Sequence, residues 1–92
     1  MHVEFDPVKN EKNIRIRGLS FERAAAFDFD TAIIAQDTRK DYPEVRYVAI
    51  GFLAARLHVL CFTPAEGGIR VISFRKANPR EVNSYEQTRP TD

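Results

Sequence analysis

The sequence has too few cysteines for an internal disulfide and no apolar run long enough for a membrane span. It contains one cysteine, one methionine and no tryptophan in 92 residues. A single cysteine cannot form an internal disulfide, and no apolar run approaches the ~20 residues that a helix needs to span a bilayer. The N-terminus lacks a positively charged region followed by an apolar one, so it does not resemble a signal peptide. We therefore expect a cytoplasmic protein without a membrane partner.

Residues with obvious catalytic or metal-binding patterns are also scarce. The two histidines, His2 and His58, are far apart, and no Cys-x-x-Cys or His-x-x-x-His spacing occurs. No glycine-rich phosphate loop is present, since Gly67-Gly68 is typical of a hairpin turn. Cys61 lies in an apolar strand segment without a recognisable basic partner, which argues against a cysteine nucleophile. The sequence therefore predicts no metal site and no cofactor.

An excess of charge of either sign is missing as well. Fourteen Lys and Arg residues face thirteen Asp and Glu residues, so the formal net charge is +1. Domains that bind nucleic acid non-specifically are usually strongly basic. If this chain binds RNA or DNA, its cations must gather on one face. The segment 69–80 allows this, because it holds four cations and no acid; the alternative is a charged strand edge that discourages strand pairing.

What is present is an ordinary globular composition, with 43% hydrophobic and 29% charged residues and no repeat. We expect one domain over residues 1–92, with a frayed tail from about residue 88. Asp6-Pro7 marks the start of a helix over residues 8–17, and Gly18 marks its end. Ser20 caps a second short helix from residue 21 to about residue 27.

The rest of the chain reads as strands followed by a helix. After a short opening strand at residues 2–5, the strand segments are 31–36, 45–51, 57–63 and 69–74. Short connections favour antiparallel neighbours. Asn78 and Glu81 form a capping box at the start of a helix from Pro79 to about Gln87. We therefore predict an α+β fold with two N-terminal helices, an antiparallel meander and a C-terminal helix, the helices covering one sheet face.

The remaining chemistry rests on Arg, Lys, Glu and Tyr. In RNA cleavage without a metal, the 2′-hydroxyl attacks the adjacent phosphorus, so the site must stabilise charge on phosphate oxygens and move protons. Glu44 and Arg46 stand two apart at a strand start and point to the same face. If that strand lies beside the one that ends in Arg75, one cluster forms. The alternative is a Glu–Arg pair of small energetic value.

Two further side chains have both a functional and a structural interpretation. Tyr85 follows Glu81 by four residues on the last helix, so both lie on one side of it. Its alternative role is to pack its ring and wet its hydroxyl. His58 lies inside an apolar strand segment, and we interpret it as a structural histidine rather than a catalyst.

Three separated segments resemble, in their order and spacing, the BrnT toxin family. They are Phe5-Asp6-Pro7-x-Lys9 with Asn13, Gly18 and Ser20-Phe21-Glu22-x-Ala24-Ala25; Glu44-x-Arg46-Tyr47-x-Ala49-Ile50-Gly51; and Arg70-Val71-Ile72-Ser73-x-Arg75-x-Ala77 followed by Arg80-Glu81 and Tyr85. The sequence departs from the family pattern at two points. Ile16-Arg17 stands where the family often has Lys-His, and Lys40 or a neighbour stands where it often has a histidine.

The resemblance implies a RelE-like fold and a translation-inhibiting endoribonuclease toxin of a type II toxin–antitoxin pair. It also implies neutralisation by a BrnA-like ribbon-helix-helix antitoxin, which would carry the complex to operator DNA. The alternative is an inactive binding module that forms a DNA-regulating complex with an antitoxin. By position, the resemblance implies catalytic residues Glu44, Arg46, Arg75, Lys76 and Tyr85, and RNA-binding residues Arg70, Arg80 and Lys40.

Overall fold

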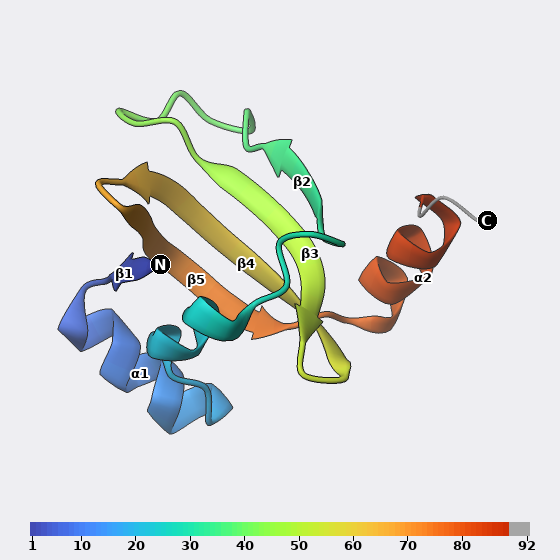
Figure 1. Cartoon of the computed structure of the whole chain (residues 1–92), viewed down its shortest axis with the longest axis horizontal. Helices are drawn as coiled ribbons and strands as arrows, with labels where there is room; N and C mark the ends of the chain where they lie inside the picture. Colours follow the sequence, from blue (N-terminus) through green and yellow to red (C-terminus); the bar gives the residue numbers. More distant parts are fainter. Residues whose placement is uncertain (89–92) are drawn as a thin grey trace.

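Five strands form one sheet in the order β1-β5-β4-β3-β2 (Figure 1). The computed structural model describes residues 1–88. All neighbouring strands are antiparallel except β1, which runs parallel to β5. The predicted α+β class and the antiparallel meander of the four later strands are confirmed, and β1 makes the sheet mixed by adding a parallel edge that was not predicted. The strands are β1 (His2–Glu4), β2 (Ile33–Gln36), β3 (Tyr47–Leu53), β4 (Arg56–Ala65) and β5 (Gly68–Lys76).

The first predicted helix is confirmed at both of its ends. In α1 (Pro7–Arg17) the Asp6 carboxylate accepts a hydrogen bond from the Val8 backbone N–H at 2.9 Å. Gly18 follows in the left-handed conformation, with φ 66°, which a residue with a side chain adopts only at a cost. The chain therefore turns sharply after Arg17.

The second predicted N-terminal helix is not an α-helix. Residues Phe21–Ala26 form a 3₁₀ helix, η1, and Ser20 accepts a hydrogen bond from the Glu22 N–H at 3.2 Å. The buried residues explain the tighter winding. Phe21, Ala24 and Phe27 recur every third residue and are 2%, 0% and 5% exposed. Three residues per turn bring such positions onto one side.

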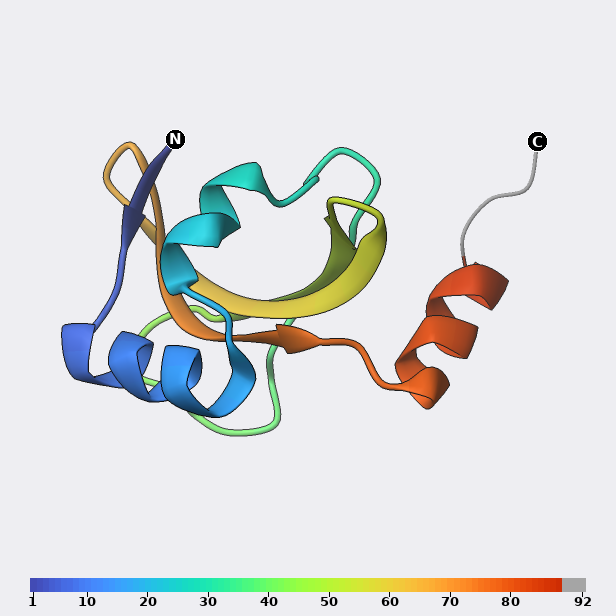
Figure 2. The same cartoon turned by 90° about the horizontal axis from the view of Figure 1, so that it is seen from below.

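The helices cover both faces of the sheet, not one face as predicted. Side chains alternate along β3, so Ala49 joins the core under η1, whereas Val48 and Ile50 pack on the core that includes Tyr85 of α2 (Pro79–Thr88). Figure 2 shows η1 in the concave side of the sheet and α2 away from it, beyond the end of β5. η1 therefore packs on one face of the central strands, and Tyr85 of α2 packs on the other.

Amide hydrogen bonds hold α1 beside β5. β1 pairs only with residues 68–70, so the following part of β5 has no strand on that side. There Asn13 donates to the backbone oxygens of Phe74 at 3.0 Å and Leu19 at 2.9 Å. Asn10 accepts from the Phe21 N–H at 2.7 Å. These asparagines are the buried residues of α1, which explains why the sequence shows so little amphipathicity.

The C-terminal helix begins as predicted, with the capping box of Asn78 and Glu81. The Asn78 N–H donates to the Glu81 carboxylate at 2.9 Å, and the Glu81 N–H donates to the Asn78 side chain at 2.8 Å. Thr88 is the last residue of α2, and the rest of the predicted frayed tail lies outside the described residues. Within residues 1–88, no helix is long and apolar enough to cross a membrane.

Candidate functional site

Four cations and one histidine line a hollow of about 450 Å³ near the C-terminal end of β5. We call it the cationic hollow. It brings together Arg75 and Lys76, two of the predicted site residues, and none of its lining residues is an acid among those that the structure describes. The lining residues are Arg17, Gly18, Leu19, Arg23, His58, Arg75 and Lys76.

Four elements meet to form the cationic hollow. Arg17 ends α1, and its guanidinium donates to the Asn13 side chain at 3.0 Å, so the helix itself holds this cation. Arg23 extends from η1. His58 of β4 lies opposite Lys76 of β5 in the sheet register, so both side chains are on the same face. Arg17 and Arg23 were not predicted as site residues, because no spacing in the chain connects them to Arg75.

Arg75 is held by a bidentate ion pair with Glu81. Its two terminal nitrogens lie 2.7 and 2.8 Å from the two carboxylate oxygens, and one also donates to the Lys76 backbone oxygen at 3.3 Å. These contacts occupy three of the five N–H donors of a guanidinium. The hydrogen bonds that Arg75 donates to Glu81 lower the pKa of Glu81 to about 2 and raise the pKa of Arg75. Arg75 is thus oriented and still has donors to offer.

His58 is buried in the wall of the cationic hollow. Its Nδ1 lies 2.8 Å from the backbone oxygen of Arg56, and its ring packs 5.5 Å from the ring of Phe74. Burial lowers the pKa of His58, and the charges of Arg56, Arg23 and Lys76 add to this effect, although the hydrogen bond to the Arg56 carbonyl opposes it. The ring is therefore neutral at neutral pH.

A second hollow, of about 280 Å³, adjoins the first, because Arg17 lines both. We call it the α1 groove. Lys9 and Lys12 line it together with the apolar residues Ile16 and Ile72. The two hollows together hold six of the fourteen cations of the chain: Lys9, Lys12, Arg17, Arg23, Arg75 and Lys76. A chain of net charge +1 has thus gathered cations on one side.

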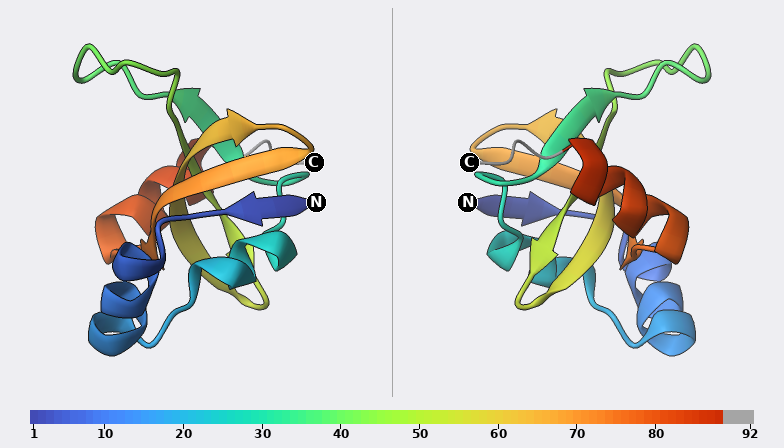
Figure 3. Two further views of the ribbon diagram at one scale, coloured as in Figure 1. Left: turned by 90° about the vertical axis from the view of Figure 1, so that its left-hand side faces the viewer. Right: turned by 90° about the vertical axis from the view of Figure 1, so that its right-hand side faces the viewer.

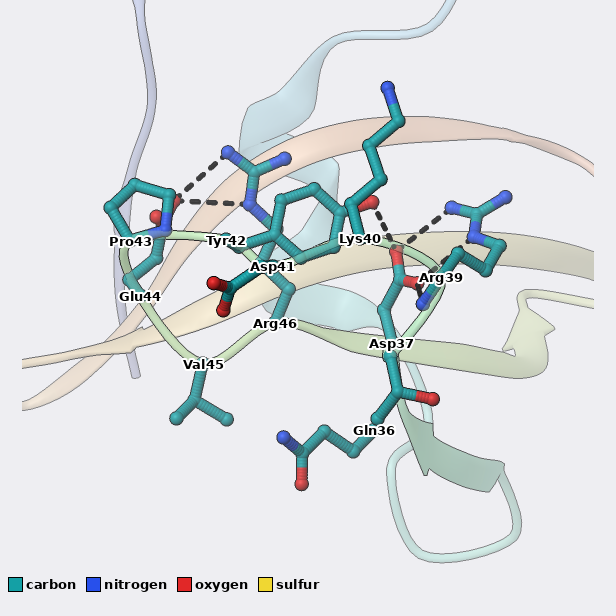
Figure 4. Close-up of a pocket in the computed structure, with 11 residues that line it drawn as sticks. Gln36, Asp37, Arg39, Lys40, Asp41, Tyr42, Pro43, Glu44, Val45 and Arg46 are labelled. Carbon is teal, nitrogen blue, oxygen red and sulfur yellow. Dashed lines mark hydrogen bonds and ion pairs between the residues drawn. The ribbon is translucent and has the colours of Figure 1, made fainter.

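Three other predicted residues, Lys40, Glu44 and Arg46, line a different hollow of about 550 Å³. We call it the loop hollow, because residues 36–46 form it (Figure 4). Figures 1 and 3 show this loop and α1 on opposite sides of the molecule. The loop joins β2 to β3, whereas α1 lies beside β5, so the two hollows lie toward opposite edges of the sheet.

Opposite charges neutralise one another in the loop hollow. Arg46 lies 3.0 Å from the Glu44 carboxylate, and its guanidinium stacks 4.2 Å from the centre of the Tyr42 ring. Arg39 lies 2.8 Å from the Asp37 carboxylate. Hydrogen bonds from Arg39 hold the pKa of Asp37 well below its usual range. This geometry fits the predicted alternative of a Glu44–Arg46 pair.

The predicted single cluster of Arg46 and Arg75 does not form. Arg75 lies opposite Val59, which lies opposite Ile50, so Arg46 is four residues away along its strand and two strands across. With ~3.3 Å per residue and ~4.8 Å between strands, the two Cα atoms are about 16 Å apart. The register places both side chains on one face of the sheet, opposite to the face that carries His58 and Lys76. Arg75 lines the cationic hollow at the part of β5 that has no strand on its outer side.

The remaining predicted residues, Tyr85, Arg70 and Arg80, line none of the three hollows. Tyr85 is 1% exposed, its ring meets Phe52 edge to face, and its hydroxyl donates to the Thr31 backbone oxygen at 2.9 Å. This arrangement favours its packing role. Arg70 lies 3.9 Å from Glu4 near the other end of β5, and Arg80 is exposed on the first turn of α2.

Metal-binding groups do not gather in the part of the chain that the structure describes. No three His, Cys, Asp or Glu side chains there lie close enough together to hold a metal ion. A comparison with curated proteins gave no match. A family model described as ribonuclease toxin, BrnT, of type II toxin–antitoxin system matches residues 5–81, which is 77 of the 92 residues and includes all three hollows.

Proposed function

The chain belongs to the BrnT family of ribonuclease toxins of type II toxin–antitoxin systems, and on that premise we propose that it cleaves RNA in the cationic hollow without a metal ion. A toxin of this type has a cognate antitoxin. One observation carries the proposal: Arg17, Arg23, Arg75 and Lys76 converge from three elements on a hollow that no acid lines among the described residues. Such an arrangement attracts an anion.

The scissile phosphate would sit against Arg75 and Lys76. When the 2′-hydroxyl attacks, negative charge grows on the non-bridging phosphate oxygens, and fixed donors stabilise this charge best when they need no rearrangement. Glu81 supplies that fixation, because it holds the Arg75 guanidinium on two sides. Arg17 and Arg23, both exposed, would hold the same phosphate or its neighbours.

The RNA strand would leave the cationic hollow through the α1 groove. Lys9 and Lys12 offer positive charge for the next phosphates, and Ile16 and Ile72 offer an apolar surface for a base. Grooves that bind single-stranded nucleic acid combine these two features. Exposed Arg80 is a further candidate contact, because it precedes Glu81 on α2.

Roles of Lys40, Glu44 and Arg46 in RNA cleavage stay predictions, as do those of Tyr85 and Arg70. The ion pairs of the loop hollow weaken its attraction for RNA, so we assign it a smaller part than the cationic hollow. Substitutions made in one hollow at a time distinguish their contributions.

We also propose how the antitoxin acts. A BrnA-like ribbon-helix-helix protein would cover the cationic hollow with acidic side chains, since buried Arg–carboxylate pairs are both specific and blocking. The complex would then reach operator DNA through the antitoxin. A protein that binds such a partner but leaves RNA intact would instead be the inactive binding module.

The deciding experiment measures growth and RNA integrity after induced expression in bacteria. Wild-type protein should arrest growth and cut RNA, and purified protein should cut an oligonucleotide with EDTA present. The double variant Arg23→Ala, Lys76→Ala should lose both effects while keeping its fold, because both side chains are exposed and neither forms an ion pair with a described residue.

The matched control is Arg15→Ala, which removes an exposed cation of α1 outside the hollows. This variant should remain as toxic as wild type. Soluble wild-type protein that leaves growth and RNA unchanged would reject the proposed enzyme. A 2′-deoxy substitution at the cut position should also block cleavage, because it removes the attacking oxygen.

A further inference from the structure

His58 shows a fixed tautomer in the cationic hollow. Its Nδ1 lies 2.8 Å from the backbone oxygen of Arg56, and a carbonyl oxygen can only accept a hydrogen bond. Nδ1 therefore carries the proton. In a neutral imidazole this leaves Nε2 with a free lone pair, which is the form that accepts protons.

The free nitrogen also has access to solvent. His58 is 4% exposed, and every buried side-chain nitrogen or oxygen of the described residues has a hydrogen-bond partner. The His58 Nε2 has no hydrogen-bond partner among the described residues. Since no buried side-chain nitrogen there lacks a partner, Nε2 must be in contact with solvent. The solvent space that His58 lines is the cationic hollow. Nε2 is therefore placed to meet a ligand in that hollow.

The surroundings keep the ring unprotonated. Cations face the hollow from every element around it: Arg17 from α1, Arg23 from η1, and Arg75 and Lys76 from β5; Arg56 precedes His58 on β4. No acid lines this space among the described residues. An added positive charge on the ring would be repelled by all of them and would lose its hydration.

Other candidates for a proton acceptor are poorly suited. Glu81 is bound on both carboxylate oxygens by Arg75, and its pKa of about 2 makes it a weak base. Glu44 belongs to the loop hollow, and the Tyr85 hydroxyl is already donated to Thr31 inside the core. Among the described residues, His58 alone combines a free lone pair with a place in the cationic hollow.

We propose that His58 is the general base that removes the proton from the attacking 2′-hydroxyl of RNA. This inference rests on the proposed function. The O2′–H proton moves to Nε2, the O2′–phosphorus bond forms and the bond from phosphorus to O5′ breaks. The imidazolium then returns its proton through water to the leaving O5′. The products are a 2′,3′-cyclic phosphate and a 5′-hydroxyl, and the ring is left as it began.

The test compares His58→Asn with His2→Asn, a change at the other histidine of the chain, which is exposed. The asparagine amide at position 58 retains an N–H for the Arg56 carbonyl. Single-turnover cleavage of an RNA oligonucleotide, measured from pH 5 to 8, should fall about 10²–10⁴-fold in His58→Asn. It should also lose its rise with pH, and added imidazole should restore part of the rate. Binding of a 2′-deoxy oligonucleotide should not change, and His2→Asn should behave as wild type.

Two results would overturn this role. One is an unchanged rate and pH profile in His58→Asn; with active wild type, the proposed function would survive and only the base would be rejected. The other is a ¹⁵N spectrum of wild-type protein showing the His58 proton on Nε2 at neutral pH, a measurement that depends neither on RNA nor on folding of a variant. Wild-type protein that never cleaves RNA would reject both proposals.

Discussion

The cationic hollow and the loop hollow both contain arginines, yet they differ in where the acids lie. In the loop hollow each ion pair joins residues two apart in sequence, Asp37 with Arg39 and Glu44 with Arg46. In the cationic hollow only Arg75 forms an ion pair within the described residues, and its partner Glu81 comes from the following helix. Local pairs neutralise the first hollow, and convergence of distant elements leaves the second positive.

This difference decides which of the two basic clusters offers free positive charge to a phosphate. Exposed ion pairs contribute little to stability, but each removes a positive charge that a phosphate could meet. Arg17, Arg23 and Lys76 form no ion pair with a described residue and their charges repel one another, so an anionic ligand would relieve that repulsion. Cations that have no ion-pair partner and repel one another are therefore a better guide to a binding site than the total number of cations.

The largest difference between the two hollows should appear when one arginine is removed from either hollow in separate variants. Arg75→Ala should lower the cleavage rate ~10²–10³-fold, because fixed donors to the phosphate are worth this much at comparable sites. Arg46→Ala and Glu44→Ala should lower it less than ~10-fold, because this pair lines the loop hollow, away from the phosphate that the cationic hollow would hold. The measurement is single-turnover cleavage at saturating protein.

Thermal unfolding supplies the control, since Arg75 also connects β5 to α2 through Glu81. Glu81→Gln keeps the guanidinium but weakens this connection, so it separates loss of stability from loss of phosphate binding. Equal losses in Arg46→Ala and Arg75→Ala would show that the loop hollow belongs to the active site, as the family resemblance implies. The contrast between the hollows would then be mistaken.

A smaller effect should follow from Asn13→Ala, which tests how α1 is held at the cationic hollow. The Asn13 amide donates to two backbone oxygens and accepts from Arg17. Its loss leaves those oxygens without their donor and should lower the free energy of unfolding by about 1–3 kcal/mol. Urea denaturation measures this, with exposed Asn83→Ala as the control. Equal stability of both variants would show that α1 needs no such anchor.

Local signals in the sequence predicted most of the elements. The Asp6 cap, the Gly18 stop and the Asn78–Glu81 capping box each involve residues within a few positions, and the structure confirms them. The 3₁₀ winding of η1 was also visible, because Phe21, Ala24 and Phe27 recur every third residue; an α-helical period was assumed instead. Local chemistry thus fixes where the elements begin and end.

Long-range geometry was not predictable in the same way. The parallel pairing of β1 with β5 joins residues 2–4 to residues 68–70, and no pattern in either segment specifies its partner. Arg17 and Arg23 reach Arg75 only after three elements pack together. His58 was interpreted as structural from its apolar neighbours, and only the placement of its two ring nitrogens supports a further role.

The α1 groove offers the next test, because it should add binding without adding catalysis. The double variant Lys9→Ala, Lys12→Ala should weaken RNA binding by about tenfold and reduce the slope of log affinity against log salt by about 1.4, which is ~0.7 for each lost phosphate contact with a single strand. Filter binding at several salt concentrations measures this. Lys40→Ala in the loop hollow is the control, and an equal change there would remove the distinction between the two surfaces.

The smallest expected effect is the pH dependence of the Arg75–Glu81 pair. The pKa of Glu81 is about 2 in the folded protein, below its ordinary 4.5, so folding favours the ionised carboxylate. Its contribution is fully present above pH 4.5 and disappears as the pH falls toward 2. We expect about 1 kcal/mol, because the pair is partly exposed and solvent screens it. The difference in unfolding free energy between wild type and Glu81→Gln should therefore shrink over this range. A difference that stays constant from pH 6 to pH 2 would mean that the pair does not stabilise the end of β5, and that Arg75 is oriented by its neighbours in the cationic hollow instead.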